Sequence, residues 1–187
     1  MHKIKLLIGV AGKISSGKST VARYISDTYH MPYISFGDYL KQYCKEHDLP
    51  VDRKTMQDLG QAFVDAGPKE FFEKVIFSQG YADCIVFDSI RHSAGIAFMK
   101  DLSEQNIVIF VDTDDTTRYE RYSKRIKDGD VKKSFAEFTA LNDHDVEKQI
   151  DEVKQYADLI IYPADDYKTV IDQFLSTYIS ISKKDDL

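Results

Sequence analysis

The sequence reads Gly12-Lys13-Ile14-Ser15-Ser16-Gly17-Lys18-Ser19 shortly after an apolar run that ends at Val10. This octapeptide satisfies the spacing G-x-x-x-x-G-K-[ST], and a chance match in a chain of this length is an event of roughly one per cent. The residues Ser19–Ala22 open a helical pattern. Loop amides and the positive end of the helix dipole then face the same point. The stretch therefore predicts a strand, a phosphate-binding loop for a nucleoside triphosphate, and a helix.

The residue types in this loop have separate tasks in phosphate binding. Gly12 and Gly17 allow the tight turn that points successive backbone N–H groups inward. Lys18 is placed to reach the β- and γ-phosphates, and the Ser19 hydroxyl to bind Mg²⁺. The alternative is a glycine-rich turn with a surface lysine, and the complete motif gives it little weight. We expect contacts to the triphosphate from Gly12, Lys13, Ile14, Ser15, Ser16, Gly17, Lys18, Ser19 and Thr20.

The whole chain has 187 residues, of which 43% are hydrophobic and 30% charged, and its formal net charge is −6. This size fits a single domain, residues 1–187. The N-terminal apolar run is too short for a membrane span or a secretory signal, so we expect it to be a buried strand.

The acidic net charge argues against a general nucleic-acid-binding protein but permits a local basic pocket. Cys44 and Cys84 are too few for a disulfide framework and favour a reducing cytoplasm, and Cys44 with His47 is expected to be ordinary rather than a zinc site.

Short apolar runs alternate with longer segments of helical spacing along the chain. Strands are predicted at Ile4–Val10, Pro32–Ser35, Cys84–Asp88, Ile107–Asp112 and Asp158–Tyr162. Helices are predicted at Ser19–Tyr29, Asp38–His47, Lys54–Asp65, Lys69–Gln79, Ser93–Leu102, Thr116–Arg125, Ser134–Gln155 and Tyr167–Ile179. Nearly continuous apolar strands between amphipathic helices indicate a parallel sheet that is covered on both faces. The fold class is therefore α/β, with a five-stranded parallel sheet.

Two motifs that GTPases need are missing from the sequence. The segment Asn142-Asp143-His144-Asp145 does not fit N-K-x-D, and Asp88-Ser89-Ile90-Arg91 does not fit D-x-x-G. The chain is also short for a ring-forming ATPase, which adds a helical domain. A small kinase fits these observations best.

Further stretches resemble one kinase family motif by motif. They are Ile34-Ser35-Phe36-Gly37-Asp38-Tyr39-Leu40-Lys41, Arg53-Lys54-Thr55-Met56-Gln57-Asp58-Leu59-Gly60-Gln61, Ile85-Val86-Phe87-Asp88-Ser89-Ile90-Arg91 and Ala157-Asp158-Leu159-Ile160-Ile161-Tyr162. Over about residues 4–180 the chain resembles the P-loop nucleoside monophosphate kinases, which include adenylate, cytidylate and deoxynucleotide kinases and, more distantly, dephospho-coenzyme A kinase. The resemblance implies the three-layer P-loop NTPase fold, with residues 36–79 as a helical acceptor-binding insertion and residues 124–145 as a short lid.

The first two stretches imply an acceptor site. The first is similar to I-S-T-G-D-x-L-R of adenylate kinases, and Lys41 stands where the arginine contacts the acceptor phosphate. Lysine keeps the charge but loses the bidentate fork. The second is similar to R-x-x-x-Q-x-L-G of phage-type deoxynucleotide kinases, which implies that Arg53 meets the phosphate and Gln57 a base edge. Ser35 is also implied in acceptor binding; without the family, Ser35 is a helix N-cap and Gln57 a solvated helix position.

The third stretch, Ile85–Arg91, places Asp88 at the carboxyl end of an apolar strand. Open α/β sheets bind their ligands at this end of the strands. A carboxylate there can hold a water of the Mg²⁺ shell. The stretch resembles the D-G-x-P-R and D-G-I-R segments of these kinases, which implies that Arg91 binds the acceptor phosphate. Ser89 replaces the glycine. The alternative for Asp88 is a solvent-facing strand end.

Arg118, Arg121 and Arg125 follow the predicted strand Ile107–Asp112. Arg121 and Arg125 are four residues apart and share one helical face. In the resembling family an R-x-x-x-R pair at the base of the lid clamps the phosphates of ATP. A surface helix with salt bridges is the alternative. Kinases of this group place further arginines after the lid, but Ser134–Gln155 contains none.

The fourth stretch is similar to the A-D-x-x-I strand near the C-terminus of the family, and implies that Pro163 and Ala164 supply backbone contacts to adenine. The resemblance thus implies a kinase that uses ATP and Mg²⁺ to phosphorylate a nucleoside or deoxynucleoside monophosphate. The implied catalytic residues are Lys18, Arg91, Arg121 and Arg125, and the implied metal ligands are Ser19 and Asp88.

Two other functions stay open at this point. Dephospho-coenzyme A kinase suits the short lid and the stretch Ala157–Ile161, and a nucleotide-binding switch would use the loop without transferring a phosphoryl group. The sequence leaves open the acceptor base, the sugar, and the choice between a monomer and a homodimer. No nucleic acid and no membrane is expected as a partner.

Overall fold

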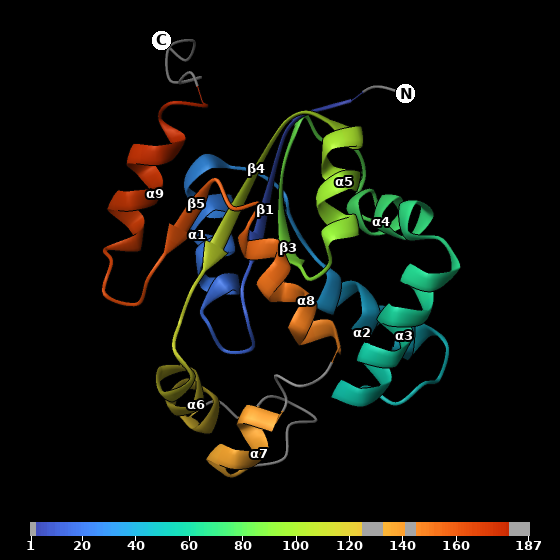
Figure 1. Ribbon diagram of the computed structural model, residues 1–187. Coiled ribbons are helices and arrows are strands. Elements are labelled where there is room, and N and C mark those ends of the chain that lie inside the picture. Colours follow the sequence, from blue (N-terminus) through green and yellow to red (C-terminus); the bar gives the residue numbers. More distant parts are fainter. Residues whose placement is uncertain (1–2, 125–132, 141–144, 180–187) are drawn as a thin grey trace.

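The computed structural model describes residues 3–124, 133–140 and 145–179. The elements follow one another as β1 (Ile4–Ala11), α1 (Lys18–Tyr29), β2 (Tyr33–Ser35), α2 (Phe36–Glu46), α3 (Arg53–Ala66), α4 (Pro68–Ile76), β3 (Cys84–Ile90), α5 (Ser93–Leu102), β4 (Ser103–Val111), α6 (Asp115–Lys124), α7 (Phe135–Thr139), α8 (Asp145–Lys154), β5 (Leu159–Ile161) and α9 (Tyr167–Leu175). Strands and helices alternate in the way that the apolar runs of the sequence indicate (Figure 1).

The five strands form one sheet in the order β2-β3-β1-β4-β5, and every described pair is parallel. All strands therefore end at the same edge. The chain leaves β1 toward β2 and leaves β3 toward β4, on the other side of β1. The carboxyl ends of β1 and β3 thus flank a topological switch point, where open α/β sheets bind their ligands.

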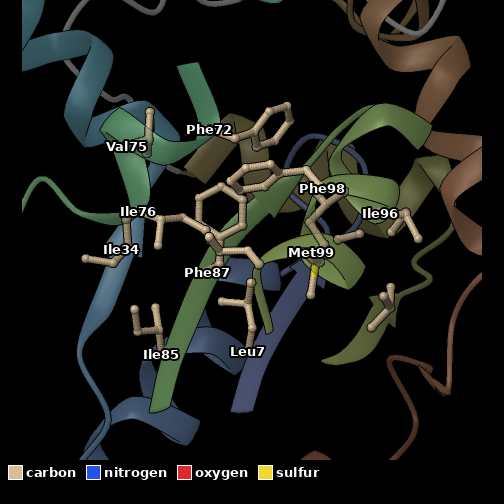
Figure 2. Close-up of a cluster of buried hydrophobic side chains, with 14 of the residues drawn as sticks. Leu7, Ile34, Phe72, Val75, Ile76, Ile85, Phe87, Ile96, Phe98 and Met99 are labelled. Carbon is tan, nitrogen blue, oxygen red and sulfur yellow. The ribbon is translucent and has the colours of Figure 1, made fainter. Parts of the chain in front are cut away.

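Alternate residues of β1 enter two separate cores. Leu6, Ile8 and Val10 belong to the cluster that packs against α1 and α9, whereas Leu7 belongs to the cluster under α4, α5 and α8. This period of two is what an extended strand imposes when helices cover both faces. Figure 2 shows Leu7 in the second cluster, beside Phe87 and near Met99 of α5. The two cores fix the sheet between two helical layers.

Three helices, α2, α3 and α4, occupy the connection between β2 and β3. Figure 1 shows them on the β2 side of the sheet, while α6 and α7 lie beyond the ends of β1 and β4. Among the described helices, none combines the length and the apolar character that crossing a bilayer requires.

The predicted fold class and the parallel five-stranded sheet are confirmed, and some boundaries were wrong. The strand predicted from Ile107 begins at Ser103, because Ser103–Asn106 pair with β1 although two of these residues are exposed. The helix predicted over Lys69–Gln79 ends at Ile76. The apolar pattern identifies only the buried part of a strand, because exposed strand residues need not be apolar.

The helix predicted over Ser134–Gln155 was wrong as one element. The structure has α7 and α8 there, and residues 141–144 between them lie outside the described part. The start of α7 is fixed by a capping box, in which the Ser134 hydroxyl accepts from Glu137 N at 3.3 Å and the Glu137 carboxylate accepts from Ser134 N at 2.7 Å. Such a cap specifies where a helix begins but not how far it runs.

Candidate active site

The glycine-rich loop links the end of β1 at Ala11 to the start of α1 at Lys18. Gly12 and Gly17 have φ angles of 149° and 103°, in a region that L side chains rarely adopt. A Cβ atom on Gly12 would also lie 2.7 Å from the carbonyl oxygen of Val111. Gly17 supplies no side-chain cap to α1. The positive end of the dipole of α1 therefore lies at this loop, where it favours an anion.

Two arginines of α6 contact the backbone of the loop. The Arg118 side chain is fully buried, and its Nη1 donates to the carbonyl oxygen of Ile14 at 3.1 Å. Arg121 Nη1 donates to the carbonyl oxygen of Ser16, which also accepts from the Thr113 hydroxyl at 3.0 Å. These two carbonyl groups of the loop are thus both bound by side chains that come after β4. Arg121 therefore lies at the phosphate-binding loop, as its predicted role requires.

The role of Arg118 as a loop support was missed at the sequence level. Arg118 also pairs with Asp115, three residues before it, and stacks over Phe138 with its guanidinium 5.3 Å from the ring centroid. Ile14, Tyr122 and Phe138 form a small third core between the loop, α6 and α7. Only the spacing of Asp115 and Arg118 is visible in the sequence. Arg125 lies outside the described residues.

Asp88 is buried, with 3% of its surface exposed, at the edge where the strands end. It aligns with Val10 of β1 on one side and with Ser35 of β2 on the other. Its Oδ2 accepts a hydrogen bond of 2.6 Å from the Tyr33 hydroxyl. Its Oδ1 finds no hydrogen-bond partner among the described residues. The carboxylate is thus not the solvent-facing strand end that the sequence left open.

The Ser19 hydroxyl and the Asp88 carboxylate are chemically suited to a magnesium ion. Mg²⁺ prefers oxygen ligands and is usually held by one or two protein oxygens together with substrate phosphates. The Ser19 hydroxyl in the first turn of α1 and the Asp88 carboxylate are donors of this kind. The Asp88 Oδ1 and the Ser16 hydroxyl are both buried polar atoms without a hydrogen-bond partner in the described part of the chain. A buried polar atom of this kind is costly unless a ligand satisfies it.

Two lysines of the loop have different surroundings. Lys18 Nζ lies 3.5 Å from the carbonyl oxygen of Lys13, so its ammonium group folds back over the loop. Lys13 Nζ instead forms an ion pair of 2.9 Å with Asp151 of α8. The same helix contacts the sheet through Lys154, which pairs with Asp112 at 2.8 Å. Helix α8 is therefore tied both to the phosphate-binding loop and to the residue that follows β4.

The predicted acceptor residues lie on α2, on α3 and after β3. Ser35 is the N-cap of α2, where its hydroxyl accepts from Asp38 N at 3.2 Å, so the N-cap reading of Ser35 is confirmed. Lys41 Nζ lies 3.6 Å from Asp38 Oδ1. Gln57 is half-buried on α3 and Arg91 is half-buried directly after β3. Arg53 is the first residue of α3, and its side chain lies outside the described part.

Aromatic residues of α2 to α4 belong mainly to the core. Phe71 and Phe72 are buried, and Phe63 stacks on Phe71 with 4.9 Å between ring centroids. A cavity of about 310 Å³ lies beside this cluster. Its lining residues are Tyr33, Ser35, Asp38, Tyr39, Gln42, Tyr43, Glu46, Ser78 and Gln79. The cavity thus shares Ser35 with the predicted acceptor residues, but its lining does not include the phosphate-binding loop.

The turn after β5 contains Pro163 and Ala164, both exposed. Asp165 closes this turn, because its carboxylate accepts from Tyr162 N at 2.7 Å and its own N donates to the Tyr162 carbonyl oxygen at 3.1 Å. Because β5 is parallel to the other strands, the turn lies along the same edge as the loop after β1. The topology therefore brings the predicted adenine turn to the ligand-binding edge of the sheet.

The comparisons with known proteins agree with this geometry. The family model of the AAA domain matches residues 8–150. No curated protein matches the chain significantly in sequence. The shikimate kinase of Bacteroides thetaiotaomicron has a TM-score of 0.61 to this chain and is 15% identical, over 94% of this chain and 99% of that chain.

Two further solved structures cover nearly the whole chain. The shikimate kinase of Aquifex aeolicus vf5 has a TM-score of 0.55 and 17% identity, over 94% of this chain and 99% of its own. TT1252 of Thermus thermophilus has a TM-score of 0.57 and 19% identity, over 96% of this chain and 100% of its own. At such low identities the likeness establishes the fold alone, which this chain shares with the two shikimate kinases.

Proposed function

We propose that this chain, which belongs to the AAA domain family, transfers the γ-phosphoryl group of ATP to a nucleoside or deoxynucleoside monophosphate with the help of Mg²⁺. The kinase fold of the solved structures and the complete phosphate-binding motif support a phosphotransferase. The choice of a nucleoside monophosphate as acceptor rests on the motifs of α2, α3 and β3.

One observation carries the proposal, and it is the strand register at the switch point. Asp88 aligns with Val10, two residues before the phosphate-binding loop, and with Ser35, directly before α2. With neighbouring strands about 5 Å apart, the donor loop and the first turn of α2 are separated by about 10 Å. A buried carboxylate lies between them. This arrangement supports a donor phosphate on one side of Asp88 and an acceptor phosphate on the other.

The transfer needs positioning and charge neutralisation rather than a covalent intermediate. The bond between the γ-phosphorus and the β–γ bridging oxygen breaks, and a bond to an oxygen of the acceptor phosphate forms. Lys18 and Arg121 would hold the donor phosphates, together with Arg125, which lies outside the described residues. Lys41, Arg53 and Arg91 would hold the acceptor phosphate. Pro163 and Ala164 would contact adenine through their backbone.

A bound Mg²⁺ would neutralise charge on the β- and γ-phosphates. Ser19 and Asp88 are the residues that would hold it. We further propose that residues 36–79 bind the acceptor and that residues 124–145 act as a lid. Closing these segments over the substrates would exclude water, which would otherwise receive the phosphoryl group.

Two alternatives share this loop chemistry. Dephospho-coenzyme A kinase would use the same donor site with a hydroxyl acceptor. A nucleotide-binding switch would use the same loop without any acceptor. Arg91 and Lys41 separate a kinase from a switch, because a switch does not need cations for an acceptor phosphate. We also propose a cytoplasmic location, because Cys44 and Cys84 are both free thiols, which a reducing compartment favours.

The proposal is tested by a coupled assay of ADP release with ATP, Mg²⁺ and a panel of acceptors. The panel contains AMP, CMP, UMP, GMP, their deoxy forms and dephospho-coenzyme A, and also shikimate because shikimate kinases share the fold. We expect release of ADP that depends on one or a few nucleoside monophosphates. Release that depends only on dephospho-coenzyme A or shikimate would replace the proposed acceptor. Equal slow release with every compound would favour a switch.

A further inference from the structure

Tyr33 contacts the carboxylate at the centre of the proposed site, although no sequence motif contains it. It lies on β2, and its hydroxyl donates to Asp88 Oδ2 at 2.6 Å across the neighbouring strand. The phenol is thus the hydrogen-bond donor and the Asp88 carboxylate the acceptor.

The ring of Tyr33 makes a second contact, with the guanidinium of Arg23 on α1. The Arg23 guanidinium lies 4.2 Å from the ring centroid, a distance typical of a cation–π contact. Arg23 Nη2 is 3.9 Å from Asp38 Oδ2, and Asp38 Oδ1 is 3.6 Å from Lys41 Nζ. Tyr33 thus contacts Arg23 of α1 through its ring and Asp88 of β3 through its hydroxyl.

The two oxygens of the Asp88 carboxylate differ in what they contact. Oδ2 receives the Tyr33 hydroxyl, whereas Oδ1 is buried and finds no hydrogen-bond partner in the described part of the chain. A hydrogen bond to one oxygen of a carboxylate fixes the rotation of the group and so the direction of the other oxygen. Metal-binding carboxylates are commonly oriented in this way by an outer hydrogen-bond donor.

We propose that Tyr33 is a positioning residue, which orients the Asp88 carboxylate so that Oδ1 receives a water of a hydrated Mg²⁺ bound with the nucleotide. This inference rests on the proposed function, because it assumes a metal–nucleotide complex at the loop. It adds that the edge strand β2 takes part in metal binding through a side chain, besides leading into the acceptor segment. Arg23 acts on the metal only through the ring of Tyr33.

Tyr33→Phe is the direct test, because it removes the hydroxyl and keeps the ring. The probe is Mn²⁺, followed by electron paramagnetic resonance, in the presence of a non-hydrolysable ATP analogue. We expect about a tenfold weaker affinity for Mn²⁺ in Tyr33→Phe, the usual effect of losing an outer partner of a metal ligand. In an Asp88→Asn background, Tyr33→Phe should cause no further loss, because both substitutions act on the same group.

Tyr29→Phe is the matched control. Tyr29 also donates its hydroxyl to a carboxylate, Asp172 of α9, at 2.9 Å, but that pair lies between α1 and α9, away from the loop. Loss of one tyrosine–aspartate hydrogen bond is thus common to both variants. Mn²⁺ affinity should be unchanged in Tyr29→Phe, so a general loosening of the fold is separated from a local effect on Asp88.

A second variant keeps the inference falsifiable if Tyr33→Phe folds poorly. Arg23→Gln changes an exposed side chain and leaves the hydroxyl of Tyr33 in place, and it should weaken Mn²⁺ binding by a smaller factor. If Tyr33→Phe folds and binds Mn²⁺ as tightly as the wild type, the inference is overturned and the proposed function is unaffected. If only Arg23→Gln folds, wild-type Mn²⁺ affinity in that variant has the same meaning. Failure of the wild-type protein to bind Mn²⁺ with the nucleotide analogue overturns both.

Discussion

Arg118 is a buried cation whose partners are a backbone carbonyl, a carboxylate and an aromatic ring. Its Nη1 donates to Ile14 O, its Nη2 pairs with Asp115, and its guanidinium lies over Phe138. Burying a guanidinium costs free energy unless such partners replace water. At the residue scale, the conformation of the loop therefore depends on the glycines within it and also on a buried arginine that binds its backbone.

Removal of Arg118 should destabilise the protein strongly. Arg118→Ala leaves the Ile14 carbonyl and the Phe138 ring around a cavity, so we expect the free energy of unfolding to fall by about 3 kcal/mol. Urea denaturation measures this change. Lys124→Ala on the same helix is the control, since Lys124 is exposed and its removal should change stability by less than about 0.5 kcal/mol. Equal stability of the two variants would contradict the support role.

Lys18 is the residue on which phosphoryl transfer depends most directly. Lys18→Ala should lower kcat by at least about 100-fold, because a charge aimed at the transferring phosphate is lost, while the thermal midpoint stays near that of the wild type. Steady-state kinetics with a saturating acceptor measure it. The control is Lys5→Ala, which removes an exposed lysine at the other end of β1 that pairs with Asp83. Retained activity in Lys18→Ala would contradict the assignment of the loop.

At the scale of elements, helix starts are set by side chains that the sequence makes visible. Asp52 caps α3, since its Oδ1 accepts from Thr55 N and its Oδ2 from the Thr55 hydroxyl, both at 2.9 Å. These bonds hold the pKa of Asp52 below its ordinary value of 3.8. A lowered pKa in the folded state means that the cap stabilises the protein fully above the ordinary value and loses this effect as the pH falls through the folded value.

Asp52→Ala should therefore be destabilised in a pH-dependent way. We expect its urea midpoint to lie below that of the wild type at pH 7. The gap should shrink as the pH falls below the ordinary value of 3.8, because the wild-type cap is then protonated. Denaturation curves of both proteins at several pH values between 2 and 7 give the comparison. A gap that is independent of pH would argue against a charged cap.

Helix α8 brings a negative charge to the phosphate-binding loop. Asp151 pairs with Lys13 of the loop at 2.9 Å, and both side chains are partly exposed. Asp151→Asn frees Lys13 to neutralise phosphate, so the KM for ATP should fall about two- to fivefold, the range for a partly exposed ion pair. Steady-state titrations with ATP at low and high salt measure this, and high salt should reduce the effect.

Asp83→Asn is the matched control for Asp151→Asn. Asp83 also pairs with a lysine, Lys5, at 2.8 Å, but at the amino-terminal end of the sheet. Its substitution should leave the KM for ATP unchanged. A raised KM in Asp151→Asn would show that the ion pair positions Lys13 for ATP, and an unchanged KM would show that the pair does not compete with the phosphates.

Local patterns predicted those parts of the site that are continuous in sequence. The strand, loop and helix around Gly12–Ser19 and the carboxylate of Asp88 were predicted because each depends on neighbours in the chain. The contacts of Arg118 with Ile14 and of Tyr33 with Asp88 were not, since they join residues 104 and 55 positions apart. The end of α7 at Thr139 was missed because the residues of α7 and of α8 both have helical spacing.

At the scale of the whole molecule, the topology gathers the donor loop, Asp88 and the first turn of α2 at one edge of the sheet. The two cores on either side of β1 hold this edge in place. The chain has a net charge of −6, yet Lys13, Lys18 and Arg121 all lie at the loop. Cations concentrated in this way attract a polyanion locally although the total charge is negative.

The fate of the γ-phosphoryl group tests this account most directly. ATP labelled in the γ-phosphate is incubated with Mg²⁺, the protein and each nucleoside monophosphate in turn, and the labelled products are separated. We predict that with one or a few acceptors the label is recovered in the nucleoside diphosphate formed from the acceptor, in amounts equal to the ADP released. Label recovered only as inorganic phosphate with every acceptor would contradict phosphoryl transfer.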